Sequence, residues 1–168
     1  MLEKYAELII KQGVNLQVGQ ELLIDASIDS YQLVRLLTKK AYEVGAKDVI
    51  VNYRDEEVTR LRYQYCSQEH FETVPLYIQE LRNQYAARHA ALVSIESSDP
   101  ELLKDIDPIK IQTWSKAVRQ ACQPFYDALD LGVNRWCIVA APSVGWANKV
   151  FPEMSDKEAV EALWKAIF

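Results

Sequence analysis

The acidic residues beside two predicted strands are the groups of this sequence best suited to bind a divalent cation. Asp25 and Asp29 lie at or just after the first predicted strand, and Asp55 and Glu56 follow the second. Carboxylate oxygens are the ligands that Mg²⁺ prefers, so one of the first two acids together with the second pair could hold this ion. The same residues also suit helix caps and exposed helix faces. Both interpretations are open at this point.

Groups that could act as nucleophiles or as transition-metal ligands are scattered. His70 and His89 each stand without a second imidazole nearby, which favours surface and strand-entry roles over a metal site. Cys137 lies within an apolar run, where a thiol is usually an inert hydrophobic group. Ser143 follows that run but lacks the flanking glycines of a nucleophile elbow, so loop hydrogen bonding is its simpler role. The glycines form neither G-x-G-x-x-G nor a phosphate-binding loop, which argues against a nucleotide site.

The segment 143–152 is predicted to be a loop that carries large apolar side chains out of the core. Aromatic residues in such a loop either fold back over the core or meet a ligand or another domain. The segment therefore joins the acidic residues as a candidate contact region. The candidate residues for lining a cleft or contacting another domain are Ser143, Trp146, Phe151, Asp29 and Asp55.

Four apolar runs, at residues 21–26, 48–53, 90–95 and 136–141, are expected to be the strands that position these groups. Helical periods separate the runs and no tight-hairpin signal joins them, which predicts an open, mainly parallel four-stranded α/β sheet with helices on both faces. We expect the strand order 2-1-3-4, because the second strand returns beside the first and the long crossover passes to its other side. The unbroken last run predicts a strand buried on both faces. Ligands bind at the carboxyl ends of the strands in such sheets.

Capping residues predict where several helices begin. Residues 97–101 and the pair Asp107-Pro108 each have the composition of a helix start. Ser155 and Glu158 form a capping box for the last helix. That helix has an apolar stripe that we expect to pack on the sheet. The stripe consists of Val160, Leu163, Trp164 and Ile167.

Composition limits the functions that the chain can have. With 168 residues, 49% of them hydrophobic, it is long and apolar enough for one α/β domain, residues 1–168. A net charge of −5 without a basic stripe argues against nucleic acid as a partner. No run approaches the roughly 20 apolar residues of a membrane span, and the N-terminus lacks the blocks of a signal peptide. Three scattered cysteines favour a reduced, cytoplasmic location.

The order and spacing of several short motifs resemble the N-terminal region of the aminopeptidase T/aminopeptidase S family of thermophilic-type metallo-aminopeptidases. The resemblance runs through essentially the whole chain. Its most specific piece is Pro142-Ser143-x-x-Trp146-Ala147-x-x-Val150-Phe151-Pro152. The other pieces are Gly13-Val14, Val18-Gly19-Gln20-Glu21-Leu22-Leu23-Ile24, Val44-Gly45-Ala46-Lys47, Tyr53-Arg54-Asp55 with Arg60 and Arg62, Ser97-Ser98-Asp99-Pro100, and Ile106-Asp107-Pro108.

This resemblance implies a cytoplasmic, homodimeric exopeptidase that removes N-terminal residues from peptides with two divalent metal ions, Zn, Co or Mg. The family's metal ligands are carboxylates and histidines of a second domain in the latter half of the enzyme, and none maps onto this sequence. The last predicted helix also runs to Phe168 without a stop signal. We therefore expect this chain to be the N-terminal part of a longer enzyme, without the metal-binding catalytic domain.

Two functional hypotheses follow from these observations. In the first, the chain is inactive alone, packs against the catalytic domain and shapes access to its cleft. In the second, it is a self-contained α/β module that binds a small ligand or Mg²⁺ at the ends of its strands. The aromatic segment 143–152 and the unfinished helix favour the first hypothesis.

Overall fold

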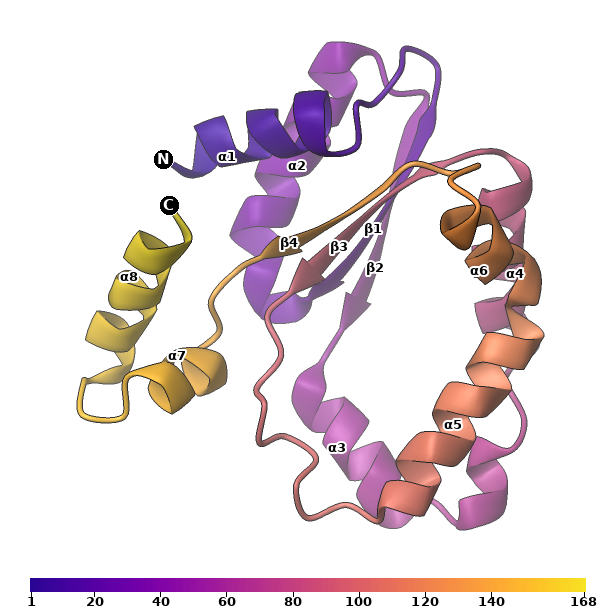
Figure 1. Cartoon of the computed structure of the whole chain (residues 1–168), viewed down its shortest axis with the longest axis vertical. Coiled ribbons are helices and arrows are strands. Elements are labelled where there is room, and N and C mark those ends of the chain that lie inside the picture. Colours follow the sequence, from indigo (N-terminus) through magenta and orange to yellow (C-terminus); the bar gives the residue numbers. More distant parts are fainter.

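Strands and helices alternate along the chain in the computed structural model, which describes residues 1–168 (Figure 1). None of the helices has both the length and the apolar character that a membrane crossing requires. The strands are β1 (Glu21–Ser27), β2 (Asp48–Arg54), β3 (Ala91–Glu96) and β4 (Trp136–Ala140). The α-helices are α1 (Leu2–Leu8), α2 (Tyr31–Val44), α3 (Glu56–Tyr65), α4 (Leu76–Ala87), α5 (Pro108–Ala121), α6 (Gln123–Asp130), α7 (Val144–Val150) and α8 (Asp156–Ile167).

The four strands form one sheet in the order β2-β1-β3-β4, and every neighbouring pair is parallel. In register, Leu23 of β1 lies between Ile50 of β2 and Leu92 of β3. Both the strand positions and the strand order predicted from the apolar runs are thus confirmed. The order changes direction between β1 and β3, which is where an open α/β sheet offers a crevice for ligands.

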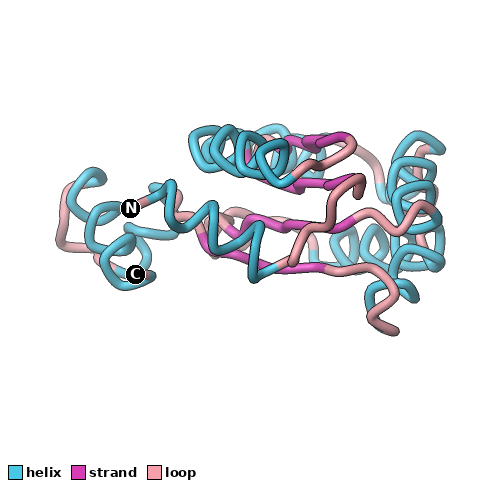
Figure 2. Tube along the Cα trace, turned by 90° about the horizontal axis from the view of Figure 1, so that it is seen from above, coloured by secondary structure: helices cyan, strands magenta, loops and turns pink.

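Helices cover both faces of the sheet, as predicted (Figures 1 and 2). Successive side chains of β1 alternate between the two faces, because side chains along a strand point in opposite directions. Leu22 and Ile24 belong to the larger core, which includes side chains of α1 and α2. Leu23 belongs to a second core with side chains of α4, α5 and α6.

The prediction that β4 is buried on both faces is wrong. Trp136 is 49% exposed and Ile138 is 61% exposed, whereas Val139, on the opposite face, is buried in the larger core. β4 is the edge strand of the sheet, so it has a neighbour on only one side. A continuous apolar run therefore marks a strand here but not its place in the sheet.

The prediction of a loop for residues 143–152 is also wrong, because residues 144–150 form α7. The Ser143 hydroxyl caps this helix by accepting a hydrogen bond from the backbone N–H of Trp146 at 3.2 Å. Ala147 is fully buried against α8. A cap and one buried face thus stabilise a helix of seven residues in spite of Gly145.

The helix start predicted at residues 97–101 is wrong, whereas the start at Asp107-Pro108 is confirmed. Residues 100–105 are a succession of turns, and their backbone hydrogen bonds span three residues, as from Leu102 N–H to the Asp99 carbonyl. The helix proper, α5, begins at Pro108, and the Asp107 carboxylate caps it.

The last helix has the predicted capping box but a different packing partner. Leu163 packs with Ala147 of α7 instead of the sheet, and Val160 and Ile167 contact the same small cluster. Trp164 alone reaches the larger core, where its ring meets Tyr5 edge-on with the centroids 6.3 Å apart. The two ends of the chain consequently lie close together (Figure 1).

Candidate functional site

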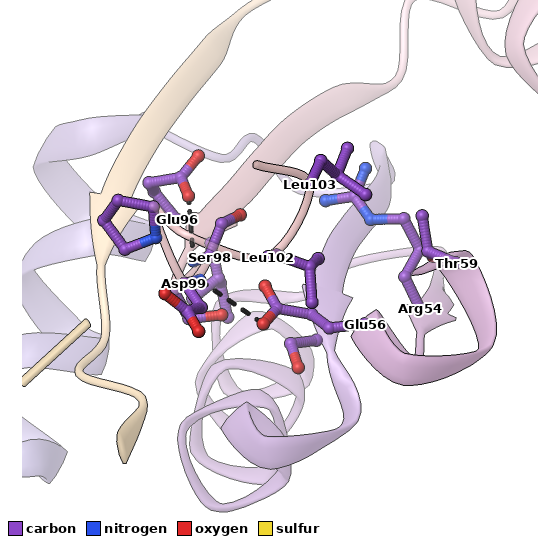
Figure 3. Close-up of a pocket in the computed structure, with 12 residues that line it drawn as sticks. Arg54, Glu56, Thr59, Glu96, Ser98, Asp99, Leu102 and Leu103 are labelled. Atoms are coloured by element: carbon purple, nitrogen blue, oxygen red, sulfur yellow. Dashed lines mark hydrogen bonds between the residues drawn. The ribbon is translucent and has the colours of Figure 1, made fainter. Parts of the chain in front are cut away.

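A cleft of about 440 Å³ lies at the carboxyl ends of β1, β2 and β3 (Figure 3). Ser27, the last residue of β1, and Ser97, directly after β3, line it, and the strand order changes direction between these two strands. Arg54, the last residue of β2, lines one wall of the cleft. The turns after β3 form the opposite wall. Ligands bind at this position in open parallel sheets. The cleft therefore lies where the predicted fold would place a ligand site.

Three acidic side chains in this cleft accept hydrogen bonds from the backbone of the turns after β3. Glu56 accepts from the N–H of Asp99 at 3.3 Å, and Figure 3 shows the two residues facing each other. Glu96 accepts from the N–H of Ser98 at 2.9 Å, and Asp99 accepts from the N–H of Glu101 at 2.8 Å. Each carboxylate therefore holds this segment in place.

Glu56 is the acid whose electrostatics the cleft changes most clearly. Partial burial raises the pKa of its carboxyl above the ordinary value of 4.5, and the hydrogen bond from Asp99 opposes this rise only in part. The negative charges of Asp99 and Asp29 raise the pKa further. The cleft thus disfavours the ionised form of Glu56.

The segment after β3 also supports α7. A Cβ atom built at Gly145 would lie 2.6 Å from Cγ of Asp99, so only glycine fits at this position without movement. Further along α7, the Lys149 ammonium group pairs with the Glu101 carboxylate at 3.0 Å. The wall of the cleft therefore packs directly on α7, which lies in the segment 143–152 expected to contact another domain.

The acidic residues considered as magnesium ligands do not converge. Asp25 is buried and accepts a hydrogen bond from the Asn52 amide at 2.7 Å. Asp55 caps α3 by accepting from the N–H of Val58 at 3.1 Å. Asp29 is exposed in the turn after β1. No three His, Cys, Asp or Glu side chains of the chain are placed to hold a metal ion together.

The histidines are equally far from forming a metal site. His70 lies beside Arg62, whose Nε is 3.4 Å from its Nε2. His89 follows α4 with φ of 55°, and its carbonyl accepts a hydrogen bond from Gln20, just before β1. The residues present therefore do not fit the pair of divalent ions that the resemblance implies.

The aromatic candidates lie on the α7–α8 pair and not in the cleft. Trp146 and Phe151 are half-buried and pack against the small cluster formed by Ala147, Ala159 and Leu163. Ser143 is buried as the cap of α7. The structure thus places Asp29 and Asp55 near the strand ends and the other three candidates on a separate unit of two helices.

Sequence patterns did not reveal the contacts of Asp99 with Glu56 and Gly145. Asp99 precedes a proline and resembles a helix cap, and in fact it does accept a local hydrogen bond from Glu101. Its other contacts come from segments 43 and 46 residues away in the chain. The only local signal is Gly145 itself, because a glycine can mark a point where another segment approaches the backbone closely.

Comparison with known proteins assigns the whole chain to one family. Residues 1–168 match the family model described as "Thermophilic metalloprotease (M29)". The chain is 40% identical to Aminopeptidase 2 of Geobacillus stearothermophilus and 42% identical to Aminopeptidase AmpS of Bacillus subtilis, in each case over 99% of its own length. The fold also matches the structure of AmpT from Thermus thermophilus, with a TM-score of 0.91 and 38% identity.

These relatives are considerably longer than the chain. The matched region spans 40% of Aminopeptidase 2, 41% of Aminopeptidase AmpS and 42% of the AmpT chain. It contains the β2-β1-β3-β4 sheet and the α7–α8 pair described above. With a family model matched from its first residue to its last, this chain belongs to the M29 family of thermophilic metalloproteases.

Proposed function

We propose that the chain is the N-terminal, non-catalytic part of a metal-dependent aminopeptidase that removes N-terminal residues from peptides. The observation that carries this proposal is the match over 99% of the chain to relatives named aminopeptidases, of which it spans only about 40%. In this proposal the rest of the enzyme holds two divalent ions, Zn, Co or Mg, and performs hydrolysis. A site with two metals needs several carboxylate or imidazole ligands around the ions, and no such group exists here.

The proposed role of the chain is to pack against the catalytic domain and to shape access to its cleft. The α7–α8 pair is the best candidate for this contact, because it forms its own small cluster and presents apolar side chains to solvent. Val144 and Val150 of α7 are both exposed, although Ala147 between them is fully buried. Ser143, Trp146 and Phe151 would position this surface, while Asp29 and Asp55 would lie nearer the strand ends.

The remaining elements of the proposal concern assembly and location. We expect the complete enzyme to act as a homodimer on peptide substrates in the cytoplasm. All three cysteines are free thiols, in keeping with a reducing compartment.

Aminopeptidase assays test the proposed division of roles. The purified chain should not release the chromophore from a leucyl chromogenic substrate when cobalt or zinc is added. Full-length Aminopeptidase T of Thermus thermophilus, assayed in parallel, provides the positive control. Metal-dependent turnover by the purified chain would refute the proposal and would return Asp29, Asp55 and Glu56 to consideration as ligands.

A second candidate function is a self-contained module that binds a small ligand in the cleft at the strand ends. The cleft of about 440 Å³ between β1 and β3 favours it, because this volume suits a small molecule. Its polar wall includes the hydroxyl groups of Ser27 and Thr59. Isothermal titration calorimetry with Mg²⁺ alone tests whether this ligand is the magnesium ion. Saturable binding at one site would support it, and no binding would exclude Mg²⁺ as the ligand.

A further inference from the structure

A second cleft, of about 450 Å³, lies on the other side of Arg54 from the acidic cleft. The end of β2 forms its floor, and α3, α4 and α5 form its walls. Three arginines from three different elements line it, Arg54 from β2, Arg62 from α3 and Arg82 from α4. This concentration of positive charge is unexpected in a chain whose net charge is −5.

No carboxylate forms an ion pair with these arginines, although Arg54 also borders the acidic cleft. None of the ion pairs of the chain includes Arg54, Arg62 or Arg82. Arg62 and Arg82 are both half-buried, and a guanidinium group that leaves water without an anionic partner loses solvation energy. Three like charges around one cleft also repel one another.

Arg62 and Arg82 both lie over aromatic rings, Arg82 over Phe125 at 5.5 Å, but these contacts use none of their hydrogen-bond donors. The guanidinium carbon of Arg62 lies 3.8 Å from the ring centroid of Trp114, which is a close cation–π contact. Arg62 donates one hydrogen bond, to His70, and Arg82 donates one, to the Tyr126 hydroxyl at 2.8 Å. A guanidinium group has five N–H donors, so most donors of these two arginines have no acceptor within the chain.

Apart from Asn52 and Thr59, the other residues that line the cleft are apolar or aromatic. Tyr63 and Trp114 lie in its wall together with Leu81, and Tyr77 stands at its rim with 72% of its surface exposed. Aromatic walls with a few converging charged groups are typical of small-molecule sites, and the volume lies in the usual range of such sites. Planar guanidinium groups bind carboxylate and phosphate by paired hydrogen bonds.

We propose that the cleft lined by Arg54, Arg62 and Arg82 binds a small anionic ligand whose carboxylate or phosphate group is attached to a flat, apolar body. The anion lies among the guanidinium groups, and the apolar body lies against Tyr63, Tyr77 and Leu81. This site is separate from the proposed aminopeptidase activity and does not depend on it, because it is formed entirely by elements of this chain.

Binding of simple aromatic anions to the 168-residue chain, followed by NMR chemical shifts, tests the proposal. N-acetyl-phenylalanine supplies a carboxylate, phenyl phosphate supplies a phosphate, and N-acetyl-phenylalaninamide supplies the same aromatic body without charge. We expect saturable shifts of the Arg62 and Arg82 side-chain resonances with at least one of the two anions. The anion that binds more tightly identifies the preferred group, and the neutral amide should bind at least about tenfold more weakly, as expected for lost charge-assisted hydrogen bonds.

Substitutions of two arginines, one in the cleft and one outside it, provide matched variants. Arg54 is exposed and makes no hydrogen bond through its side chain, so Arg54→Gln should leave the thermal midpoint unchanged and weaken anion binding about tenfold. Arg54→Glu should abolish binding. Arg60→Gln removes the same charge from a residue that pairs with Glu57 and does not line the cleft, and it should bind like the parent chain.

Three results would overturn the proposal. Equal affinity for the neutral amide would mean that aromatic packing, and not charge, drives binding. Equal losses of anion affinity in Arg54→Gln and Arg60→Gln would mean that the overall charge of the chain, and not the cleft, attracts the anion. Absence of binding by both anions at concentrations up to about 10 mM would show that cation–π stacking alone explains the arginines.

Discussion

At the scale of single residues, the carboxylates near the strand ends serve mainly to hold backbone in place. Asp55 caps α3, Asp99 accepts the N–H of Glu101, and Glu56 accepts the N–H of Asp99. Most contacts of these acids are thus hydrogen bonds to backbone N–H groups, as expected for caps. Glu56 differs from the others because partial burial and neighbouring negative charges raise the pKa of its carboxyl.

Gly145→Ala tests how tightly Asp99 packs against α7. At an unobstructed helix position, replacing glycine with alanine stabilises a protein by roughly 0.5–1 kcal/mol. Here the new Cβ would lie 2.6 Å from Cγ of Asp99, and such overpacking costs about 1–3 kcal/mol. We expect a net decrease of about 1–2 kcal/mol in the free energy of unfolding, measured with urea.

The double variant Gly145→Ala/Asp99→Gly is the control for this experiment, because it removes the obstructing side chain. The penalty of Gly145→Ala should be smaller in the Asp99→Gly background than in the parent chain. An increase in stability from Gly145→Ala alone would contradict the close contact.

Glu56→Gln is expected to raise the thermal midpoint at pH 7. Because the pKa of Glu56 is higher in the folded chain than its ordinary value of 4.5, the folded state binds this proton more tightly than the unfolded state does. The resulting loss of stability develops as the pH rises from 4.5 through the folded pKa and is complete above it. Glutamine removes the charge and keeps an oxygen that can accept the Asp99 N–H.

Thermal midpoints of the parent chain and of Glu56→Gln should therefore converge as the pH falls below 4.5. Glu153→Gln, which removes an exposed carboxylate, is the control and should show no comparable gain at pH 7. A Glu56→Gln protein that is less stable at pH 7 would indicate that the hydrogen bond to Asp99 outweighs the burial of charge.

At the scale of elements, α7 and α8 form a unit that is only partly joined to the sheet. Leu163 and Ala147 bury each other between the two helices, and the Asn148 amide donates to the Asp156 carboxylate at 2.8 Å. Trp164 packs against the larger core, and the rings of Trp164 and of Phe168, just after α8, both meet Tyr5 edge-on. This arrangement explains why a short helix with a glycine in its first turn is stable.

Leu163→Ala tests the packing of this unit. Leu163 is 6% exposed, and truncation of buried leucines costs about 2–5 kcal/mol. We expect a loss at the lower end of this range, about 2–3 kcal/mol, because the cluster around it is small and can relax. Denaturant midpoints give the value, and Lys157→Ala, at an exposed site of the same helix, should change it by less than about 0.5 kcal/mol. No loss from Leu163→Ala would mean that α8 is frayed.

At the scale of the whole molecule, two cores lie on opposite faces of one sheet, and the α7–α8 cluster is a third, smaller one. β1 contributes to both large cores and has parallel neighbours on both sides, so its hydrogen bonds are well protected. β4 is exposed on one face, and α8 depends on a few contacts. The stability of the chain is therefore expected to be uneven.

Hydrogen exchange followed by mass spectrometry checks this expectation. Segments of low contact density open at lower free energy than the core strands. Amides of α8 should therefore exchange at least about tenfold faster than those of β1, a difference of about 1.4 kcal/mol in opening free energy. Equal protection of the two segments would show that α7 and α8 unfold only together with the sheet.

Short-range patterns in the sequence determined the number of strands, their positions and most of the helix boundaries. Apolar runs mark strands because a strand buried between helices must be apolar on both faces. Gly45 ends α2 with φ of 97°, and Asp107 and Ser155 start helices, because these local effects need no distant partner. The parallel order followed from the absence of hairpin signals and from the handedness of crossovers.

Only the tertiary structure decided which surfaces these elements bury and which side chains meet. The apolar run of β4 is half-exposed because the strand lies at the edge of the sheet. The segment expected to be a loop is the helix α7, and α8 packs on it. The contact of Asp99 with Gly145, like the gathering of Arg54 and Arg82 in one cleft, joins segments distant in the chain. Such contacts depend on how helices lie on the sheet, and local hydrophobic periodicity carries no information on that arrangement.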